Sequence, residues 1–424
     1  MVSPENSHSQ WQIAVFPDPK PQILKKPLSL RKTSPQVSNE KKIKILFRHR
    51  SMEMGGVEKV MLSLMHNLDP EKFEISVLLN INQGELRDEF PKHIRKVFLA
   101  DGKEDLSTNS IIQKIQLFNR KRKLDWFRKN PTVVDKKILK EEFDIEVAMT
   151  YNDFEAVLHS SNKRSKKLGW FHSEIQLPKL QPLVPKILEH FPKFDYMVYC
   201  SERIQQLMHE HYPALAYPQE KVIINAIPIE EIKRKATENP SPFAKNDLPT
   251  FVSIGRLHTR KGYHKLIVAH QKLIQEGFQH QIIVLGDGEE RQNLQNQINN
   301  SGVQKTFLLA GNQMNPYPYV QHSDFFILPS ESEAWPLVIA EALILQKPII
   351  ATNVGDVGMV IKDGETGILI DYHTEEMYHA MKLFLTQPEL VQHIKSNLRT
   401  IEQQFDNQKI FNEVENLMLT LVHQ

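Results

Sequence analysis

Residues 324–342, with the sequence DFFILPSESEAWPLVIAEA, decide the fold class of this 424-residue chain. The short apolar run at 324–328 predicts a buried strand of a parallel sheet. Ser330 and Glu331 then offer capping groups, and Pro336 fits the first turn of a helix. A buried strand that leads directly into a helix is typical of an α/β protein.

Two glutamates flank the start of this predicted helix. Glu333 is expected in the loop between strand and helix, and Glu341 in the second turn of the helix. Open parallel sheets bind ligands at the carboxyl ends of their strands, where a helix N-terminus also presents unpaired N–H groups to anions. Two carboxylates beside such a helix end suit a ligand with hydroxyls on both sides of a phosphate, as in a nucleotide sugar.

The bulk properties describe an ordinary globular protein. Apolar residues make up 40% of the chain and charged residues 25%, and the length is sufficient for two α/β domains. The net charge of +2 indicates no particular partner. Cys200 is the only cysteine, which excludes an intramolecular disulfide and favours a reducing compartment. We expect it to be a small core residue rather than a nucleophile.

No targeting or membrane-spanning segment is expected. The N-terminus lacks the continuous apolar stretch of a signal peptide. The most apolar run, residues 335–350, is interrupted by charges and is shorter than the ~20 residues that span a bilayer. These features predict a cytoplasmic protein, either soluble or attached to the inner face of the membrane.

Strand and helix patterns alternate over most of the chain, which predicts two doubly wound α/β domains. The predicted parts are an extension at 1–40, a first domain at 41–228, a charged and proline-rich linker at 229–249, a second domain at 250–390 and C-terminal helices at 391–424. Strands are expected at 43–47, 75–79, 97–99, 145–149, 168–171, 196–200, 222–224, 251–255, 281–285, 307–309, 324–328, 349–351 and 368–370.

A basic stretch interrupts the first domain. Residues 120–129, from Arg120 to Lys129, mix cations with aromatic residues, and a second cluster lies at 163–167. One interpretation is a solvated helix face. The other is a contact with anionic lipid headgroups or a phosphorylated acceptor, to which each cation contributes ~1 kcal/mol. Nucleic acid fits less well because no nucleic-acid-binding motif accompanies the charge.

Further loops carry residues suited to binding an anion. Arg256 and Lys261 lie in the loop after the strand at 251–255, where two cations favour diphosphate binding over a plain basic turn. Gly286 lies in a glycine loop that shapes a pocket or makes a tight turn. Asn315 lies in a loop that could hold a nucleobase. Gly55 and Gly56 follow the first strand and allow backbone to approach a phosphate, or form an ordinary turn.

Taken together, these motifs make the chain resemble retaining glycosyltransferases of family 4, also called glycosyl transferases group 1, which have the GT-B fold. That fold places two Rossmann-like domains around a central cleft. The resemblance covers about residues 43–385 and rests on an ordered set of segments: 55–58 (GGVE), 170–172 (WFH), 224–225 (IN), 255–262 with Arg256 and Lys261, 286–288 (GDG), 315–317 (NPY), and Glu333 with Glu341 eight positions later.

The resemblance implies a role for each of these residues. Arg256 and Lys261 would neutralise the leaving diphosphate, Glu341 would hold the ribose hydroxyls, and Glu333 would face the transferred sugar. His172 would lie beside the donor sugar; without the resemblance it would be taken for a core or surface histidine. The other implied donor-binding residues are Gly55, Gly56, Gly286, Asn315, Ala334, Trp335, Pro336 and Leu337. No metal or cofactor is implied apart from the nucleotide-sugar co-substrate.

Some positions depart from the family pattern. Met359 stands where a glutamate is common, and Ala334 and Pro336 replace two common glycines. The leading hypothesis is a retaining glycosyltransferase that moves a sugar, by family frequency from a UDP-sugar, to a glycan or glycolipid in surface polysaccharide synthesis. A catalytically silent nucleotide-sugar-binding subunit is the alternative. A nicotinamide-dependent oxidoreductase ranks last, because residues 47–58 lack its glycine spacing.

Overall fold

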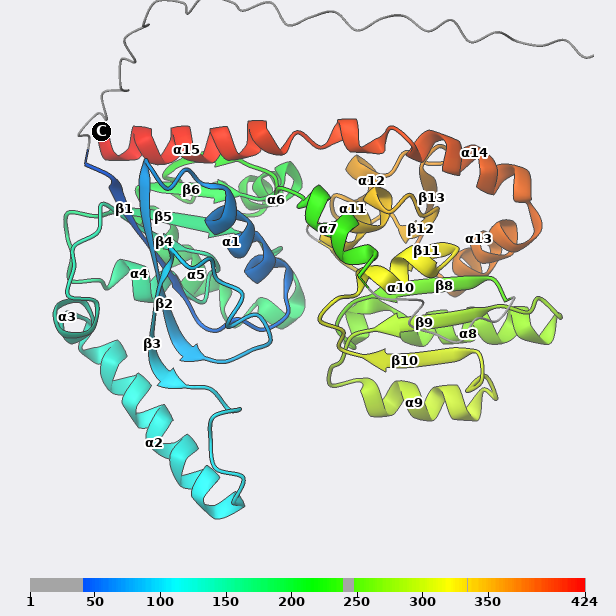
Figure 1. Ribbon diagram of the computed structural model, residues 1–424, viewed down its shortest axis with the longest axis horizontal. Coiled ribbons are helices and arrows are strands. Elements are labelled where there is room, and N and C mark those ends of the chain that lie inside the picture. Colours follow the sequence, from blue (N-terminus) through cyan, green and yellow to red (C-terminus); the bar gives the residue numbers. More distant parts are fainter. Residues whose placement is uncertain (1–40, 239–247, 334, 424) are drawn as a thin grey trace, which may run out of the picture. The chain divides into compact units, whose positions relative to one another are not determined.

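A computed structural model describes residues 41–238, 248–333 and 335–423. The predicted extension at 1–40 and the middle of the predicted linker lie outside the described residues, as does Ala334. Two parallel sheets organise the described part of the chain (Figure 1). Helices separate the consecutive strands of both sheets, except β2 and β3 of the first sheet, so the predicted α/β class is confirmed.

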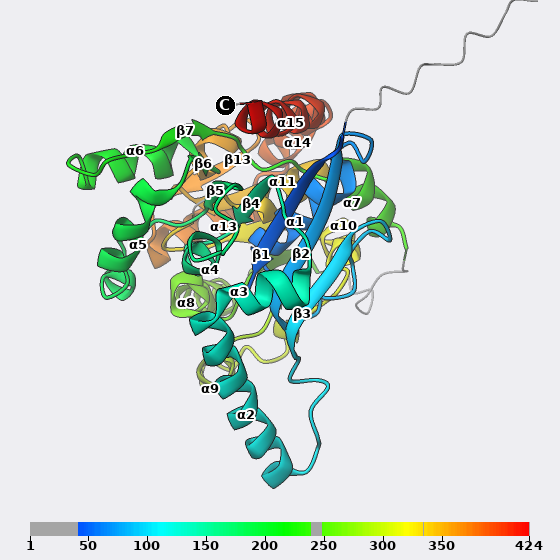
Figure 2. The same cartoon turned by 90° about the vertical axis from the view of Figure 1, so that its left-hand side faces the viewer.

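The first sheet has the strand order β3-β2-β1-β4-β5-β6-β7. In register, Phe47 of β1 lies between Val77 of β2 and Val147 of β4. Helices flank this sheet, and α2 leans away from it in both ribbon views (Figures 1 and 2). Its strands are β1 (Ile43–His49), β2 (Phe73–Asn82), β3 (Arg95–Asp101), β4 (Ile145–Ala148), β5 (Lys166–Phe171), β6 (Tyr196–Tyr199) and β7 (Gln219–Val222). Its helices are α1 (Gly56–Asn67), α2 (Ser110–Lys129), α3 (Pro131–Val133), the π-helix η1 (Val134–Leu139), α4 (Phe154–Leu158), α5 (Val184–His190) and α6 (Glu202–His211).

The second sheet has the strand order β10-β9-β8-β11-β12-β13. The order reverses direction between β8 and β11, which is where open parallel sheets place their ligand sites. Its strands are β8 (Thr250–Ile254), β9 (Gln281–Leu285), β10 (Phe307–Gly311), β11 (Phe325–Leu328), β12 (Ile349–Thr352) and β13 (Gly367–Ile370). The helices are α7 (Ile229–Ala236), α8 (Tyr263–Gln275), α9 (Arg291–Asn300), α10 (Tyr317–His322), α11 (Leu337–Ile344), α12 (Val357–Val360), α13 (Thr374–Thr386), α14 (Pro388–Leu398) and α15 (Asn407–His423).

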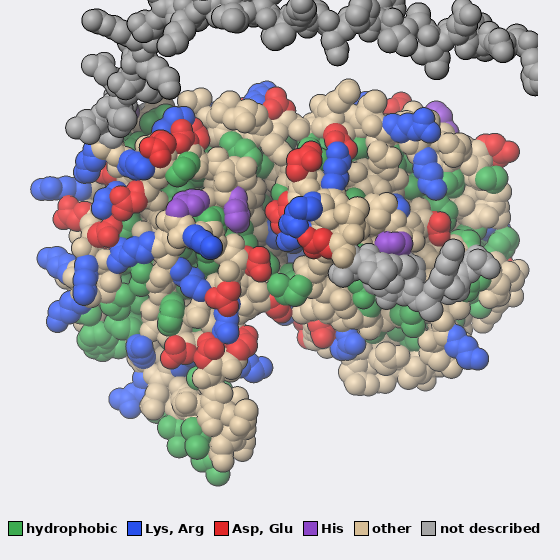
Figure 3. Space-filling model, in the orientation of Figure 1, with side chains coloured by type: hydrophobic (Ala, Val, Ile, Leu, Met, Phe, Trp, Pro, Cys, Tyr) green, Lys and Arg blue, Asp and Glu red, His purple; other side chains and the backbone are tan. Residues whose placement is uncertain are grey.

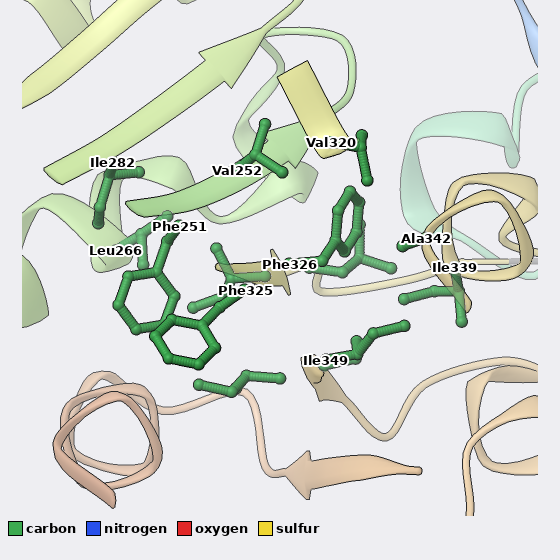
Figure 4. Close-up of a cluster of buried hydrophobic side chains, with 14 of the residues drawn as sticks. Phe251, Val252, Leu266, Ile282, Val320, Phe325, Phe326, Ile339, Ala342 and Ile349 are labelled. Carbon is green, nitrogen blue, oxygen red and sulfur yellow. The ribbon is translucent and has the colours of Figure 1, made fainter. Parts of the chain in front are cut away.

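The core of the second half fixes α11 on its sheet. Ile339 and Ala342 of α11 are fully buried near Phe326 of β11 (Figure 4). On the other side of the strand, the Phe325 and Phe251 rings lie 4.8 Å apart between centroids. Burying each such side chain stabilises the fold by about 1.5–3 kcal/mol. Because α11 carries Glu341, this packing also fixes the position of that carboxylate.

Two segments join the halves of the chain. Helix α7 lies in the predicted linker and buries Ile232 and Ala236 in the second core, so the linker begins as an amphipathic helix. Helix α15 buries five apolar residues in the core of the first half: Phe411, Val414, Leu417, Met418 and Leu421. Lys72 and Glu415 add an ion pair of 2.7 Å to this contact.

Candidate active site

The site forms where the carboxyl ends of β8, β9 and β11 converge. Two glycines allow their loops to touch. Gly262 has φ +70°, and a Cβ atom there would lie 1.9 Å from the carbonyl oxygen of Pro329. Gly286 has φ +140°, and its Cβ would lie 2.1 Å from the carbonyl oxygen of Gly255. Only glycine permits these approaches, so the loops that carry Lys261 and Glu333 are packed together.

Lys261 and Glu333 form an ion pair in this loop cluster. The Lys261 Nζ to Glu333 Oε1 distance is 2.5 Å, and the Ser330 hydroxyl donates to the same oxygen over 2.6 Å. Both side chains are largely shielded from solvent. The predicted capping role of Ser330 and Glu331 is wrong: Pro336 is the N-cap of α11, which has no side-chain cap, and Ser330 instead positions Glu333.

Glu341 has one occupied and one unoccupied carboxylate oxygen. Its Oε1 accepts from Lys59 Nζ at 2.6 Å and from the Tyr317 hydroxyl at 3.2 Å. Burial and the Glu341 charge raise the pKa of Tyr317, so its hydroxyl remains a donor. Glu341 Oε2 is buried and has no hydrogen-bond partner among the described residues. A buried carboxylate oxygen without a partner is costly, so this oxygen is suited to accept a hydrogen bond from a ligand hydroxyl or a water molecule.

Helices α1 and α11 meet at their N-terminal ends. A Cβ atom added at Gly56 would lie 3.5 Å from Leu337 Cδ1, and Leu337 packs against both cores. One turn further along each helix, Lys59 reaches Glu341. Gly55 caps α1 with extended backbone. The predicted glycine pair and the predicted Glu341 are therefore close neighbours, with two helix N-termini beside them.

His172 lies just after β5, and its imidazole is neutral. Its Nε2 atom is buried and has no hydrogen-bond partner among the described residues. Burial, and then the charge on His49, lower the pKa of His172 to about 3. The ring stacks parallel to Trp170, with centroids 6.4 Å apart. A neutral imidazole with a free nitrogen can exchange a hydrogen bond with a sugar hydroxyl without carrying charge.

His49 supplies a fixed positive charge behind His172. Its Nδ1 lies 2.9 Å from Asp153 Oδ2 and its Nε2 lies 3.4 Å from Glu58 Oε1. Burial alone would lower the pKa of His49, but Asp153 and then Glu58 outweigh it and raise this pKa to about 10. The imidazolium thereby ties the end of β1 to the N-terminal end of α1, which carries the glycine pair.

Two predicted residues, Arg256 and Asn315, contact groups outside the loop cluster. The Arg256 side chain is 72% exposed and pairs with Glu289 at 3.3 Å. The Asn315 amide donates to the carbonyl oxygen of Lys235 at 2.8 Å and so anchors α7. Gly286 shapes the loop contact described above. Pro336 and Leu337 begin α11, next to Trp335, whose buried Nε1 has no partner among the described residues.

Two residues of the site were missed from the sequence. Lys59 follows the Gly55-Gly56 pair by less than one helical turn. A cation this close to an expected phosphate-binding loop could have been predicted as a site residue. Glu174 follows His172 beyond the carboxyl end of β5. Burial raises its pKa, Arg203 and Arg260 lower it, and Asp356 and Glu333 raise it further.

Within the described residues, no group of three or more His, Cys, Asp or Glu side chains could hold a metal ion. The expectation that no metal is needed stays a prediction. No described helix is both long enough and apolar enough to cross a bilayer.

Residues 235–400 match the family model described as Glycosyl transferases group 1. The match spans α7 to α14 and includes Lys261, Glu333 and Glu341. The family model therefore covers the second sheet and most of its helices, which is less than half of the chain.

Curated relatives agree with this family. The chain is 27% identical over 268 residues to the uncharacterised glycosyltransferase MJ1059 of Methanocaldococcus jannaschii, covering 57% of this chain and 64% of that protein. It is 28% identical over 192 residues to the N-acetylgalactosamine-N,N'-diacetylbacillosaminyl-diphospho-undecaprenol 4-alpha-N-acetylgalactosaminyltransferase of Campylobacter jejuni, covering 45% of this chain and 51% of the relative. Both matches span less than two thirds of the relative.

A solved structure extends the comparison to nearly the whole chain. Anabaena Alr3699/HepE in complex with UDP and glucose is 18% identical, with a TM-score of 0.71, and the match covers 89% of this chain and all of that one. At this identity the match establishes the fold. The predicted GT-B architecture of two Rossmann-like domains is confirmed.

Proposed function

We propose that this chain is a retaining glycosyltransferase that takes a sugar from a nucleotide-diphosphate sugar. The observation that carries the proposal is the state of Glu341. Lys59 and Tyr317 saturate one oxygen, and the other is buried and unpaired beside two helix N-termini. A ribose hydroxyl would satisfy that oxygen, and the diphosphate would lie near the helix ends. Glu341 is then the anchor of the donor.

Glu333 and Lys261 are the groups nearest the chemistry. When the sugar leaves, negative charge grows on the diphosphate and positive charge on the anomeric carbon. Lys261 would neutralise the first, with Arg256 swinging in from its exposed position. Glu333, held by Lys261 and Ser330, would accept hydrogen bonds from sugar hydroxyls and stabilise the second. Their direct ion pair holds the two side chains together, which supports a role for both at one reacting centre.

His172 and Glu174 are proposed to contact the transferred sugar and the acceptor. The unpaired Nε2 of His172 would bond a hydroxyl of the transferred sugar, and its neutrality avoids repulsion with the developing cation. Glu174 would face the acceptor hydroxyl. Metal independence is part of the proposal, with cationic side chains neutralising the diphosphate.

UDP is the proposed nucleotide and a lipid-linked glycan the proposed acceptor. The Anabaena structure contains UDP and glucose, and the Campylobacter relative is named for a diphospho-undecaprenol acceptor. Membership of family 4 and a role in surface polysaccharide synthesis at the cytoplasmic face of the membrane are further parts of the proposal.

A combined binding and transfer assay tests the proposal. The full chain would be screened by thermal shift against UDP-, GDP-, ADP- and TDP-sugars, since a ligand of the native state raises Tm by mass action. The stabilising donor would then be assayed for transfer to a lipid-linked acceptor and for the anomeric configuration of the product. We expect one donor to stabilise the protein and to yield a product with retained configuration. Binding without turnover on any acceptor would favour a silent subunit, and no binding would refute the donor site.

A further inference from the structure

Helix α2 is held to the protein along one side only. Among its 20 residues none is fully buried. Leu124 and Phe127 pack against a small core beneath it. Gln116 accepts from the backbone N–H of Ser107 at 2.9 Å, and Arg120 donates to the carbonyl oxygen of Asp101 at 3.2 Å. The helix is therefore a fixed arm that presents its other side to solvent, away from the sheet (Figures 1 and 2).

Large apolar side chains lie on that outer side. Ile111, Ile115 and Phe118 share one face at helical spacing, and they are 69%, 55% and 60% exposed. Arg122, Trp126 and Lys129 continue the same stripe, and Trp126 is 51% exposed. Hydrophobic side chains gather at the end of the arm in the space-filling view (Figure 3). An apolar stripe of this kind on an otherwise stable helix marks an interaction surface.

The same helix concentrates positive charge. It carries seven Lys or Arg residues and a single acidic residue, Asp125, although the net charge of the whole chain is only +2. The Arg122 guanidinium carbon lies 5.8 Å from the centroid of the Phe118 ring. A shallow hollow beside it is lined by Asn119, Arg122, Lys123, Asp125, Trp126 and Lys129. Apolar residues followed by cations and a tryptophan form the pattern of a helix that lies in a bilayer interface.

We propose that this outer face of α2, defined by Ile111, Ile115, Phe118, Arg122, Trp126 and Lys129, docks on an anionic lipid bilayer. The isoleucines and Phe118 enter the acyl boundary, Trp126 lies at headgroup level, and the cations pair with lipid phosphates. The inference rests on the proposed function and deepens it, because docking would hold the first domain at the surface where a lipid-linked acceptor resides. The sequence indicates the cations at 120–129 as a membrane contact, but the apolar residues Ile111, Ile115 and Phe118 of this surface were not predicted.

Both chemical halves of the surface contribute to the expected affinity. One cation near an anionic surface is worth ~1 kcal/mol, which is about a fivefold change in partitioning. Loss of two cations should therefore weaken binding by more than tenfold. Loss of Phe118 and Ile115 removes the part of the binding that persists at high salt, because burial of apolar surface is not screened.

The test is co-sedimentation of the full chain with vesicles of phosphatidylglycerol and phosphatidylcholine, and with phosphatidylcholine alone. Three double variants are compared: I115S/F118S, R122Q/K129Q and, as a matched control in the second half, K305Q/L308S, which removes one exposed cation and one exposed apolar residue. Equal Tm values establish that each is folded. We expect binding to anionic vesicles only, a loss of at least tenfold in the first two variants, and no change in the control.

Three outcomes would overturn the proposal. The first is that both α2 variants bind vesicles as tightly as wild type, and the second is that wild type binds neutral and anionic vesicles equally. The third is that duplex DNA at matched phosphate concentration displaces the protein from vesicles, which would indicate a nucleic-acid surface. Transfer to a water-soluble acceptor separates this inference from the enzymatic one. Normal transfer in solution without vesicle binding would refute only the docking surface. Vesicle binding without any transfer would refute only the proposed function.

Discussion

Lys59 and Glu341 form a 2.6 Å ion pair that joins helix α1 to helix α11. The two residues are 282 positions apart in the sequence, and each lies one turn into a helix that begins at the site. The pair occupies Oε1 of Glu341 and orients the unpaired Oε2. Lys59 is therefore expected to position the carboxylate proposed to bind the donor, rather than to take part in bond breaking.

Removal of Lys59 should weaken donor binding more than it slows the chemical step. For Lys59→Met we expect KM for the donor to rise about tenfold, since a charge-assisted hydrogen bond contributes about 1.5–3 kcal/mol, while kcat changes little. Lys59→Arg should restore most of the affinity. Steady-state kinetics with the identified donor check this, and an unchanged KM with a collapsed kcat would show that Lys59 acts in the chemistry instead.

Glu333 and Lys261 should show the opposite division between binding and catalysis. Glu333→Gln and Lys261→Ala each remove charge that matters as the transition state forms, so we expect kcat to fall about 10²–10³-fold. Because the two groups are ion-paired, the double variant should lose much less than the product of the single losses. If the loss of kcat in the double variant equals the product of the two single losses, the two residues act independently.

The fold should become less dependent on His49 at high pH. The pKa of His49 is raised to about 10, so its pairing with Asp153 stabilises the protein fully below the unfolded value near 6.5 and is lost as pH rises toward 10. His49→Gln should cost on the order of 3 kcal/mol at pH 6. The difference in unfolding free energy from wild type should shrink steadily between pH 6.5 and 10. Urea unfolding at several pH values measures it, and a pH-independent difference contradicts the assignment of charge.

Gly262 offers a test of the loop contact beneath the site. Gly262→Ala combines a positive φ with a backbone clash at Pro329, whereas Gly277→Ala has φ +92° and no atoms within 4 Å of the new Cβ. The control should cost about 1 kcal/mol in unfolding free energy, from the backbone conformation alone. Gly262→Ala should cost several kcal/mol more, or shift the loop and lower donor affinity. Equal destabilisation by both changes would argue that the loops are not in close contact.

Much of the fold was predictable because parallel strands are buried on both faces. The runs at 251–255, 281–285 and 349–351 are apolar and short, and each is a strand of the second sheet. The strand expected at 222–224 is wrong in position: β7 spans Gln219–Val222, an edge strand whose polar sequence QEKV carries little signal. Helix α7 was hidden because its charged surface resembles a linker composition, although Ile232 and Ala236 are buried.

The site was less predictable than the fold, because its chemistry depends on contacts across long sequence separations. The sequence predicted separate roles for Glu333, Glu341 and Lys261. It could not reveal the ion pair between Lys261 and Glu333 or the contact of Lys59 with Glu341. It also gave no sign that Arg256 pairs with Glu289. Side-chain direction in a loop is set by tertiary packing, which spacing alone does not encode.

The central claim is that Glu341 holds the ribose of a nucleotide donor through its free oxygen. Titration calorimetry of UDP into wild type and Glu341→Gln tests it most directly, with Glu375→Gln, an exposed helical glutamate far from the site in sequence, as the control. We predict that wild type and the control bind UDP with equal affinity and that Glu341→Gln binds about 10–100-fold more weakly. Equal affinity of Glu341→Gln and wild type would contradict the account.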